Sequence, residues 1–235
     1  MLFRLKRWLG RSPQLSQQQQ QRLDAWSALP RTELGEPVSE LRCVVVDVET
    51  SGLSLQEDKL ISIGAVAVVS GKVALGDSFY MVLQQQAASD KGNILLHGIG
   101  TAEQLKGEPP VEALLAFLDY LGKSPLIAFH VTFDETMIRR ALSEYLGFSF
   151  KHPWLDLAYV MPSLNPALAR DHHALDDWIG HFGIRIDVRH NALADALATA
   201  QLFQIALAQT GKKNITDFAG LRDLEKAQRW VNRVS

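Results

Sequence analysis

Apolar residues gather in three short blocks after residue 40. The blocks are rich in β-branched residues and are separated by short turns, one of them at Gly71-Lys72; they span 41–48 (LRCVVVDV), 59–69 (KLISIGAVAVV) and 73–83 (VALGDSFYMVL). Runs of this length and composition are typical of buried strands. Because short connections favour antiparallel neighbours, the pattern predicts an antiparallel meander of three strands.

The apolar spacing becomes helical after the pair Pro109-Pro110. Helices are predicted where apolar residues recur every three or four positions, and these segments are 111–122, 133–146, 154–164, 173–182 and 191–208. The segment 124–129 (SPLIAF) predicts a further short strand. Strands first, and then alternating strand and helix, indicate an α/β fold in which helices cover a mixed sheet.

The two ends of the chain differ from this middle part. Residues 1–41 are predicted to form an extension, partly helical or disordered, with a basic start (Met1–Arg11), a glutamine run (Gln17–Gln21) and a stretch of possible helix that ends near Pro30. The basic start predicts either a solvated tail or a contact with a partner, a membrane surface or nucleic acid. Residues 211–235 are predicted to form a C-terminal helix packed on the domain 42–210.

Composition narrows the class of protein. A chain of 235 residues suffices for one domain with an extension. The net charge of −2 excludes a protein surrounded by positive potential, so any nucleic-acid binding must be local or metal-assisted. The single cysteine, Cys43, excludes an internal disulfide. We expect a cytoplasmic protein, because no apolar stretch is long enough to span a bilayer and no secretory signal is recognisable.

Two acidic residues lie near the end of the first apolar block. Asp47 and Glu49 are two positions apart, and alternate side chains of a strand project from one face. Two like charges this close cost free energy unless a cation lies between them, and oxygen ligands suit hard cations such as Mg²⁺ or Mn²⁺. The alternative is a strand end at which both carboxylates face water. The turn that follows, Thr50-Ser51-Gly52-Leu53, can bring backbone N–H groups close to a sugar or phosphate.

Two more acidic residues lie near predicted helix starts. Asp134 follows an apolar strand, and an N-cap is the alternative to a cation-facing role. His190 precedes Asp195 by five residues, and Asn191 is predicted to cap the helix between them. Asp195 points either outward to water or inward to the sheet, and a lone histidine near a helix start is more often a surface residue. These features are the Asp47 and Glu49 pair, the turn that follows it, Asp134, and the His190 and Asp195 pair. Because each occurs in the expected order and on a strand end or helix start, together they predict a carboxylate site.

Together these residues resemble the DEDDh (DnaQ-like) 3′–5′ exonuclease family, which includes the proofreading epsilon subunit of bacterial DNA polymerase III, RNase T and oligoribonuclease. The resemblance covers about residues 42–206. Its three motifs are Asp-x-Glu-Thr-x-Gly, a His three residues before Phe-Asp, and His-x-x-x-x-Asp; they are met by Asp47, Glu49, Thr50 and Gly52, by His130, Phe133 and Asp134, and by His190 and Asp195. His97-Gly98-Ile99 also matches a loop of many members, and Asn191 stands where a sister group has Tyr.

The resemblance implies a ribonuclease-H-like fold with a mixed five-stranded sheet flanked by helices. It also implies two divalent cations, Mg²⁺ or Mn²⁺, held by Asp47, Glu49, Asp134 and Asp195, with His190 taking a proton from the attacking water. By the same analogy, the substrate contacts would come from Thr50, Ser51, Gly52, Leu53, His97 and Phe133. Ordinary packing is the alternative for Leu53 and Phe133, and Asp156 is interpreted as a helix cap or as a support of the site.

The resemblance therefore implies a metal-dependent exonuclease that hydrolyses single-stranded DNA from its 3′ end to nucleoside monophosphates, in proofreading or repair. Trimming of RNA 3′ ends is the runner-up, because only a 2′-hydroxyl separates the two substrates locally. A protein of another class, a non-catalytic or regulatory polymerase-associated subunit, is the third possibility. The expected partners are a single-stranded 3′ end and a polymerase or another replication or repair protein.

Overall fold

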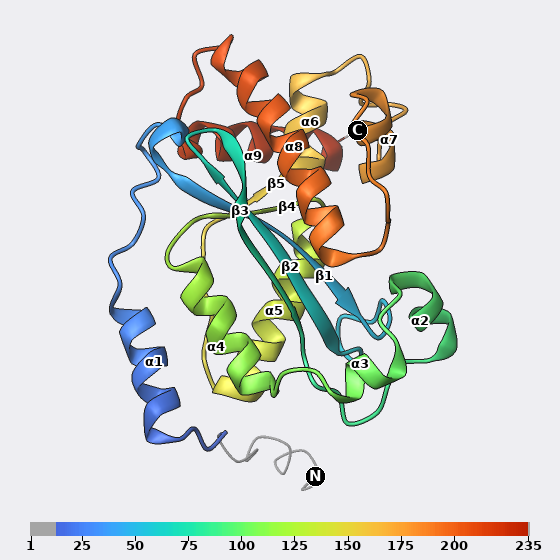
Figure 1. Cartoon of the computed structure of the whole chain (residues 1–235). Helices are drawn as coiled ribbons and strands as arrows, with labels where there is room; N and C mark the ends of the chain where they lie inside the picture. The colour runs from blue at the N-terminus through green and yellow to red at the C-terminus, as the bar shows by residue number, and fades with distance from the viewer. Residues whose placement is uncertain (1–12, 235) are drawn as a thin grey trace, which may run out of the picture.

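A five-stranded mixed sheet forms the centre of the protein in the computed structural model, which describes residues 13–234. The strand order is β3-β2-β1-β4-β5, with bounds β1 Arg42–Thr50, β2 Leu60–Val69, β3 Lys72–Val82, β4 Leu126–Ala128 and β5 Trp154–Asp156. The first three strands pair antiparallel, and β4 and β5 run parallel to β1. The predicted mixed five-stranded sheet is confirmed (Figure 1).

Helices cover both faces of this sheet (Figure 1). Their bounds are α1 Gln17–Ala28, α2 Lys91–His97, α3 Thr101–Leu105, α4 Pro110–Leu121, α5 Val131–Leu146, α6 Leu157–Leu164, α7 Leu175–His181, α8 Ala192–Gly211 and α9 Phe218–Val234, with a short 3₁₀ turn at Val38–Glu40. One face packs against α1, α4 and α5, and the other against α6, α7, α8 and α9. The sheet is therefore the most buried layer of the molecule.

The two faces of β1 belong to two separate hydrophobic cores. Val44, Val46 and Val48 lie in the core shared with α4 and α5, whereas Cys43 and Val45 lie in the core shared with α6 and α8. Successive side chains of a strand alternate between faces. The odd-numbered positions of β1, which include both of its acidic residues, therefore face α8.

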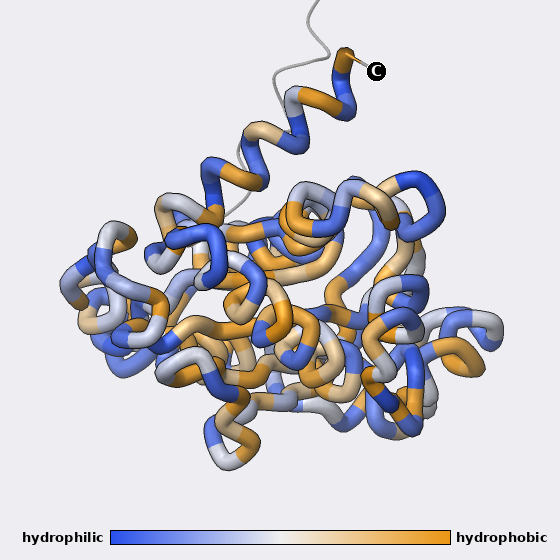
Figure 2. Tube along the Cα trace, turned by 90° about the horizontal axis from the view of Figure 1, so that it is seen from above, coloured by the Kyte–Doolittle hydropathy of each residue, from blue (hydrophilic) through white to orange (hydrophobic). Residues whose placement is uncertain are grey.

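The segments at the two ends pack on this domain. On α1, Leu23 and Trp26 are buried, while Arg22 forms ion pairs with Glu112 and Asp119 of α4. The first half of α9 buries Phe218 and Leu221, and its far end projects from the body (Figure 2). The predicted boundaries after residues 41 and 210 stay predictions, and the basic start Met1–Arg11 lies outside the described residues.

Two predicted helices differ from the structure. The segment 154–164 begins with the strand β5, and α6 follows only at Leu157; a strand of three residues is too short to show the period of two that identifies strands. The helix predicted from residue 133 begins at Val131, with His130 as its N-cap. Asp134 therefore lies inside the first turns of α5, and its interpretation as an N-cap is wrong.

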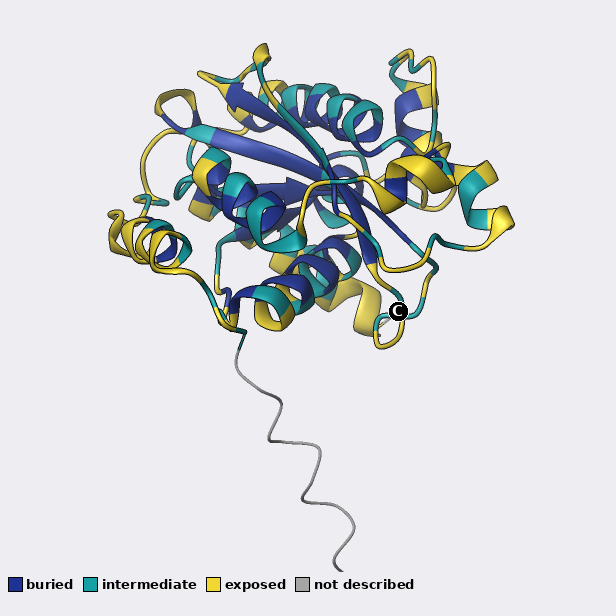
Figure 3. Cartoon of the chain, turned by 60° about the horizontal axis from the view of Figure 1, so that its bottom comes forward, coloured by how far each residue is buried: buried dark blue, intermediate teal, exposed yellow. Residues whose placement is uncertain are grey.

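Burial decreases outward from the sheet, from its buried strands to the exposed outer faces of the helices (Figure 3). Most residues of β1 and β2 are buried. Among residues 13–234, no helix combines the length and apolar character that a membrane crossing would need.

Candidate active site

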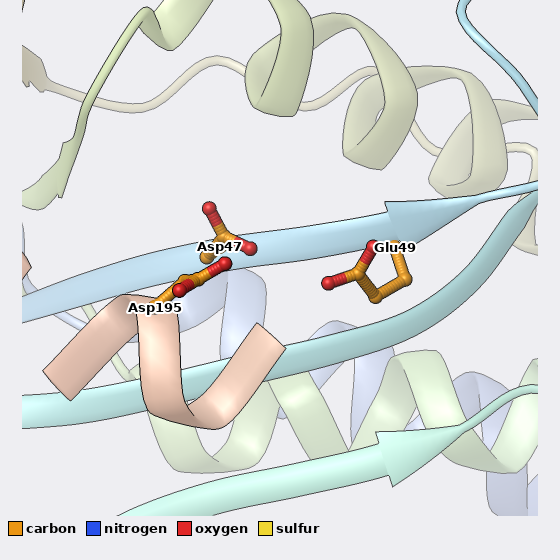
Figure 4. Close-up of side chains that lie close together, drawn as sticks. All are labelled: Asp47, Glu49 and Asp195. Carbon is orange, nitrogen blue, oxygen red and sulfur yellow. The ribbon is translucent and has the colours of Figure 1, made fainter. Parts of the chain in front are cut away.

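Three carboxylates converge on the face of the sheet that α8 covers. Asp47 and Glu49 project from β1, and Asp195 from the first turns of α8 (Figure 4). Each of the three offers a carboxylate oxygen within 4.8 Å of the others. This arrangement agrees with the inward direction for Asp195, a residue that is only 5% exposed. We call these three residues the carboxylate cluster.

A glycine of β2 lets α8 come this close to the sheet. Gly64 pairs directly with Asp47 in the antiparallel register. A Cβ atom at residue 64 would lie 2.2 Å from the backbone carbon of Ala192 and from the backbone nitrogen of Leu193. Such a distance is far inside van der Waals contact, so only glycine fits without moving the helix. The role of Gly64 was not predicted from the sequence, although a lone glycine inside an apolar strand signals a close backbone approach.

We expect Gly64→Ala to push the first turn of α8 away from β1 and to separate Asp195 from Asp47. The free energy of unfolding should fall by about 1–3 kcal/mol, as for other overpacked sites, and Mn²⁺ binding measured by calorimetry should weaken. Gly76→Ala on β3 is the matched control, because a Cβ there has no neighbour within 4 Å. If both variants behave alike, α8 is not held by this contact.

Asp134 supplies a fourth carboxylate from α5, one of the helices on the opposite face of the sheet from α8. It lies on α5 at 5% exposure, and its charge raises the pKa of Asp47 more than that of any other residue does. It is not one of the three residues within 4.8 Å of one another. Asp134 therefore adjoins the carboxylate cluster from the side of α5.

The four acids are in an environment that opposes their ionisation. Burial, together with the charge of Asp195, raises the pKa of Glu49 to about 7. Burial raises the pKa of Asp47 well above its usual range, and the neighbouring acids raise it further. Burial also raises the pKa of Asp134 and of Asp195. These closely spaced carboxylates are difficult to ionise when no cation is bound. A hard divalent cation would stabilise their ionised forms, because it prefers oxygen ligands and offsets their mutual repulsion.

The metal-free protein is expected to lose stability as the pH rises from about 4.5 to about 7, because folded Glu49 keeps its proton over this range and the unfolded chain does not. Above that range Mg²⁺ should restore stability, since it binds the deprotonated carboxylates. Melting temperatures with EDTA or MgCl₂, at about pH 5 and about pH 8, measure both effects. Equal stabilisation by Mg²⁺ at the two pH values would contradict this expectation.

The loop before α8 clamps Asp195 from two sides. The backbone N–H of His190 donates to Oδ2 of Asp195 at 3.0 Å, and the guanidinium of Arg189 donates to Oδ1. Arg189 also pairs with Asp176 of α7 at 2.6 Å. Asn191 caps α8 through the N–H of Ala194 at 3.1 Å, as predicted. Arg189 was not among the predicted site residues, although its guanidinium is the cation that contacts Asp195.

His190 contributes its backbone, rather than its ring, to this clamp. Its φ of 57° lies in the left-handed region, and its side chain is exposed. The imidazole therefore lies outside the carboxylate cluster, at its solvent side, where a bound strand or water would meet it.

The turn after β1 is held in shape by an acidic residue, Asp58. Its carboxylate accepts the Ser51 hydroxyl at 2.8 Å and the Ser54 N–H at 2.7 Å. A Cβ at Gly52 would lie 2.5 Å from the same carboxylate, so a larger residue there would have to displace Asp58 from these hydrogen bonds. The Thr50 hydroxyl donates to the Gly52 carbonyl at 2.6 Å. The turn is rigid.

Leu53 projects from this turn at 86% exposure. Ordinary core packing therefore does not explain it. Phe133, in contrast, packs against the core shared by α4 and α5.

His97 is buried at the end of α2, next to the same turn. Its Nδ1 accepts the N–H of Ile99 at 3.0 Å, and Nε2 lies 3.4 Å from the Ser89 hydroxyl. Burial lowers the pKa of His97, so the ring is neutral and holds its own loop. Asn93 of α2 donates to the Ser51 carbonyl, which joins this loop to the turn after β1.

Asp156 links the C-terminal helix to the start of α5. It caps α6 through the N–H of Ala158 at 3.1 Å, as predicted, and the same oxygen accepts the N–H of His130 at 3.0 Å. Its other oxygen accepts Arg229 of α9 at 2.8 Å. The Arg229–Asp156 pair therefore supports, from behind, the helix that carries Asp134. Sequence reasoning had no signal for Arg229.

The chain is similar in sequence to proteins named as DNA polymerase III. DNA polymerase III PolC-type of Thermotoga petrophila is 29% identical over 183 residues, which are 77% of this chain and 13% of that protein. DNA polymerase III subunit epsilon of Aquifex aeolicus is 28% identical over 187 residues, 79% of this chain and 90% of that protein. The chain thus spans only a small part of the PolC-type relatives.

Two solved structures share the fold. Exonuclease I of E. coli, in complex with a dT13 oligonucleotide, has a TM-score of 0.62 at 19% sequence identity. The alignment covers 73% of this chain and 42% of the exonuclease I chain. Exonuclease X, in complex with 5′ overhanging duplex DNA, has a TM-score of 0.61 at 16% identity and covers 78% and 99%. These likenesses agree with the ribonuclease-H-like fold that the motifs imply.

The family model RNase_T, described as Exonuclease, matches residues 44–203. This range contains all four acids and His190. Because the match spans more than half of the 235 residues, the protein belongs to the exonuclease family, in its DnaQ-like 3′–5′ group.

Proposed function

We propose that this chain removes nucleoside monophosphates one at a time from the 3′ end of single-stranded DNA. The observation that carries the proposal is the carboxylate cluster, with Asp134 beside it, on a fold of the exonuclease family. All four acids of the family motifs are present, together with His190. This set of residues favours catalysis over a purely regulatory role on the same fold.

Two Mg²⁺ or Mn²⁺ ions are the proposed cofactors. Asp47, Glu49 and Asp195 would hold one, and Asp47 and Asp134 the other. All the donors are carboxylate oxygens, which suit hard cations. When bound, such ions activate water and neutralise charge on the phosphate.

The remaining residues are proposed to position the strand and move a proton. His190 would accept the proton of the attacking water, because its ring is on the solvent side of the cluster and histidine serves commonly as a general base. Thr50 to Leu53 would contact the terminal nucleotide, with exposed Leu53 against its base. His97 and Phe133 would shape the pocket from behind, where their rings are partly or fully buried.

DNA is the proposed substrate because the relatives are DNA polymerase III proteins and exonuclease I is seen with a dT13 oligonucleotide. Proofreading or repair trimming is the corresponding role, with a polymerase or another replication or repair protein as partner and the cytoplasm as location.

The test uses 5′-labelled single-stranded DNA and RNA of one sequence, incubated with the full chain in Mg²⁺, Mn²⁺ or EDTA. The proposal expects a ladder that shortens from the 3′ end, needs a metal and forms faster on DNA. A blocked 3′ phosphate should stop it, because the reaction starts at a free hydroxyl. Faster cleavage of RNA would reject the DNA assignment alone, and no metal-dependent product from either strand would reject the proposed activity.

A further inference from the structure

A basic cavity of about 600 Å³ lies at the other end of the sheet. Its lining includes four cations, Arg31, Lys123, Lys151 and Arg222, and no acidic residue among the described ones. Pro153 of the lining directly precedes β5, and Lys123 lies three residues before the first residue of β4. The acids on β1 lie toward the opposite end of the parallel strands, beyond the pairing of Val44 with Leu126. We call this cavity the basic pocket.

The cations of the basic pocket have no ion-pair partner among the described residues. None of the four forms an ion pair with the rest of residues 13–234. Lys123 is half-buried, and burial and the nearby Arg31 lower its pKa. Like charges gathered without a partner cost free energy in a chain whose net charge is −2. An anionic ligand would remove that cost.

About half of the residues that line the pocket lie outside the family match at 44–203. Residues 26–34 and Arg222 supply one wall. Hydrogen bonds fix this wall: Thr32 donates to the Lys123 carbonyl at 2.6 Å, and the N–H of Ala219 donates to the Leu34 carbonyl at 3.0 Å. Two appended segments thus form one ordered surface that the family's chemistry does not require.

Apolar side chains lie among the cations. Leu29 is 43% exposed, and Leu34 is half-buried in the same lining. Trp26 is only 5% exposed, and the ammonium of Lys123 lies 3.2 Å from its ring centroid. Nucleic-acid bases need an open aromatic face for stacking, and Trp26 does not offer one. The two other rings of the lining, Phe148 and His152, are half-buried and already pack against Trp26 and Phe150. Aliphatic contacts beside positive charge match a peptide that carries both carboxylates and an apolar side chain.

We propose that the basic pocket docks an acidic segment of a partner protein, with its carboxylates on the four cations and an apolar side chain on Leu29 and Leu34. The chain's own first residues do not complement it, since residues 1–12 carry Arg4, Lys6, Arg7 and Arg11 and no acid. The inference is independent of the nuclease reaction.

Fluorescence anisotropy with the full chain tests it. The probes are four labelled hexapeptides, each made of four acidic residues (Asp and Glu) and two copies of one apolar residue. The apolar residue is Leu in the first peptide, Ile in the second, Phe in the third and Trp in the fourth. Each has a matched neutral peptide in which Asn replaces Asp and Gln replaces Glu. At least one acidic peptide should bind saturably and more weakly as NaCl is added, while its neutral match should not bind. Failure of every acidic peptide to bind would overturn the proposal.

Charge reversal locates the binding. The double variant R31E/K151E changes two exposed lining cations, and K72E/R139E changes two exposed, unpaired cations elsewhere on the described chain. The first should weaken peptide binding about tenfold or more, because two attractions become repulsions; the second should not. Nuclease activity should be the same in both. Equal peptide binding in the two variants would reject a peptide site. A labelled hexathymidylate serves as a single-stranded DNA probe in the same assay, and loss of its binding in R31E/K151E alone would also reject a peptide site.

Discussion

Asp47→Asn is expected to abolish nucleotide release while the fold persists. Asp47 is the acid whose pKa is raised by all three of the others, so it lies at the electrostatic centre of the site. Loss of one ligand of a hard cation removes several kcal/mol of stabilisation of the reacting phosphate, which is on the order of 10³-fold or more in kcat. Single-turnover cleavage of a 5′-labelled strand in Mg²⁺ measures the loss.

The same variant should be at least as stable as the native chain in EDTA, because asparagine ends the repulsion among buried carboxylates. Asp171→Asn is the matched control, since Asp171 is an exposed acid outside the site. Loss of folding in Asp47→Asn, seen by circular dichroism, would mean that Asp47 holds the structure rather than a cation. Full activity would remove it from the mechanism.

His190→Asn is expected to slow turnover by about 10²–10⁴-fold, the usual contribution of a general base. Asparagine is chosen because it tolerates the left-handed φ of 57° at this position. The backbone N–H that donates to Asp195 is retained in the variant. Cation binding should therefore persist, which separates a lost proton acceptor from a collapsed site.

Calorimetry with Mn²⁺ and the pH profile of kcat check the two halves of this expectation. The rate of the native chain should rise with pH as a base titrates, and the variant should lack that limb. His181→Asn, an exposed histidine of α7, serves as the control. An identical pH profile in native chain and variant would exclude His190 as the base.

Local patterns in the sequence were enough to predict the first three strands and to single out the acids. The β-branched runs predicted β1 and β2 because both strands bury nearly continuous apolar residues. The third run predicted β3 because a short turn lets it pair antiparallel with β2. The spacing of Asp47 and Glu49 predicted one shared face, which the structure confirms (Figure 4). Their proximity to Asp195 followed from the order of motifs, because no local pattern brings a distant helix to a strand.

Features that depend on tertiary contact were missed. The need for glycine at residue 64 exists only because α8 crosses there, and Arg229 meets Asp156 only when α9 folds back on β5. A lone glycine or arginine in sequence does not say what it will touch. The three residues of β5 likewise become a strand only by pairing with β4.

The distribution of the acids along the chain has a consequence for biosynthesis. Asp47, Glu49 and Asp134 are made early, whereas Asp195 lies on α8 near the end of the domain. Chains leave the ribosome from the N-terminus onward, so a nascent chain holds an incomplete ligand set until α8 has emerged and docked at Gly64. Truncated products of synthesis or proteolysis that lack α8 would therefore be inactive. Nuclease activity would begin only after the complete domain has been synthesised and folded.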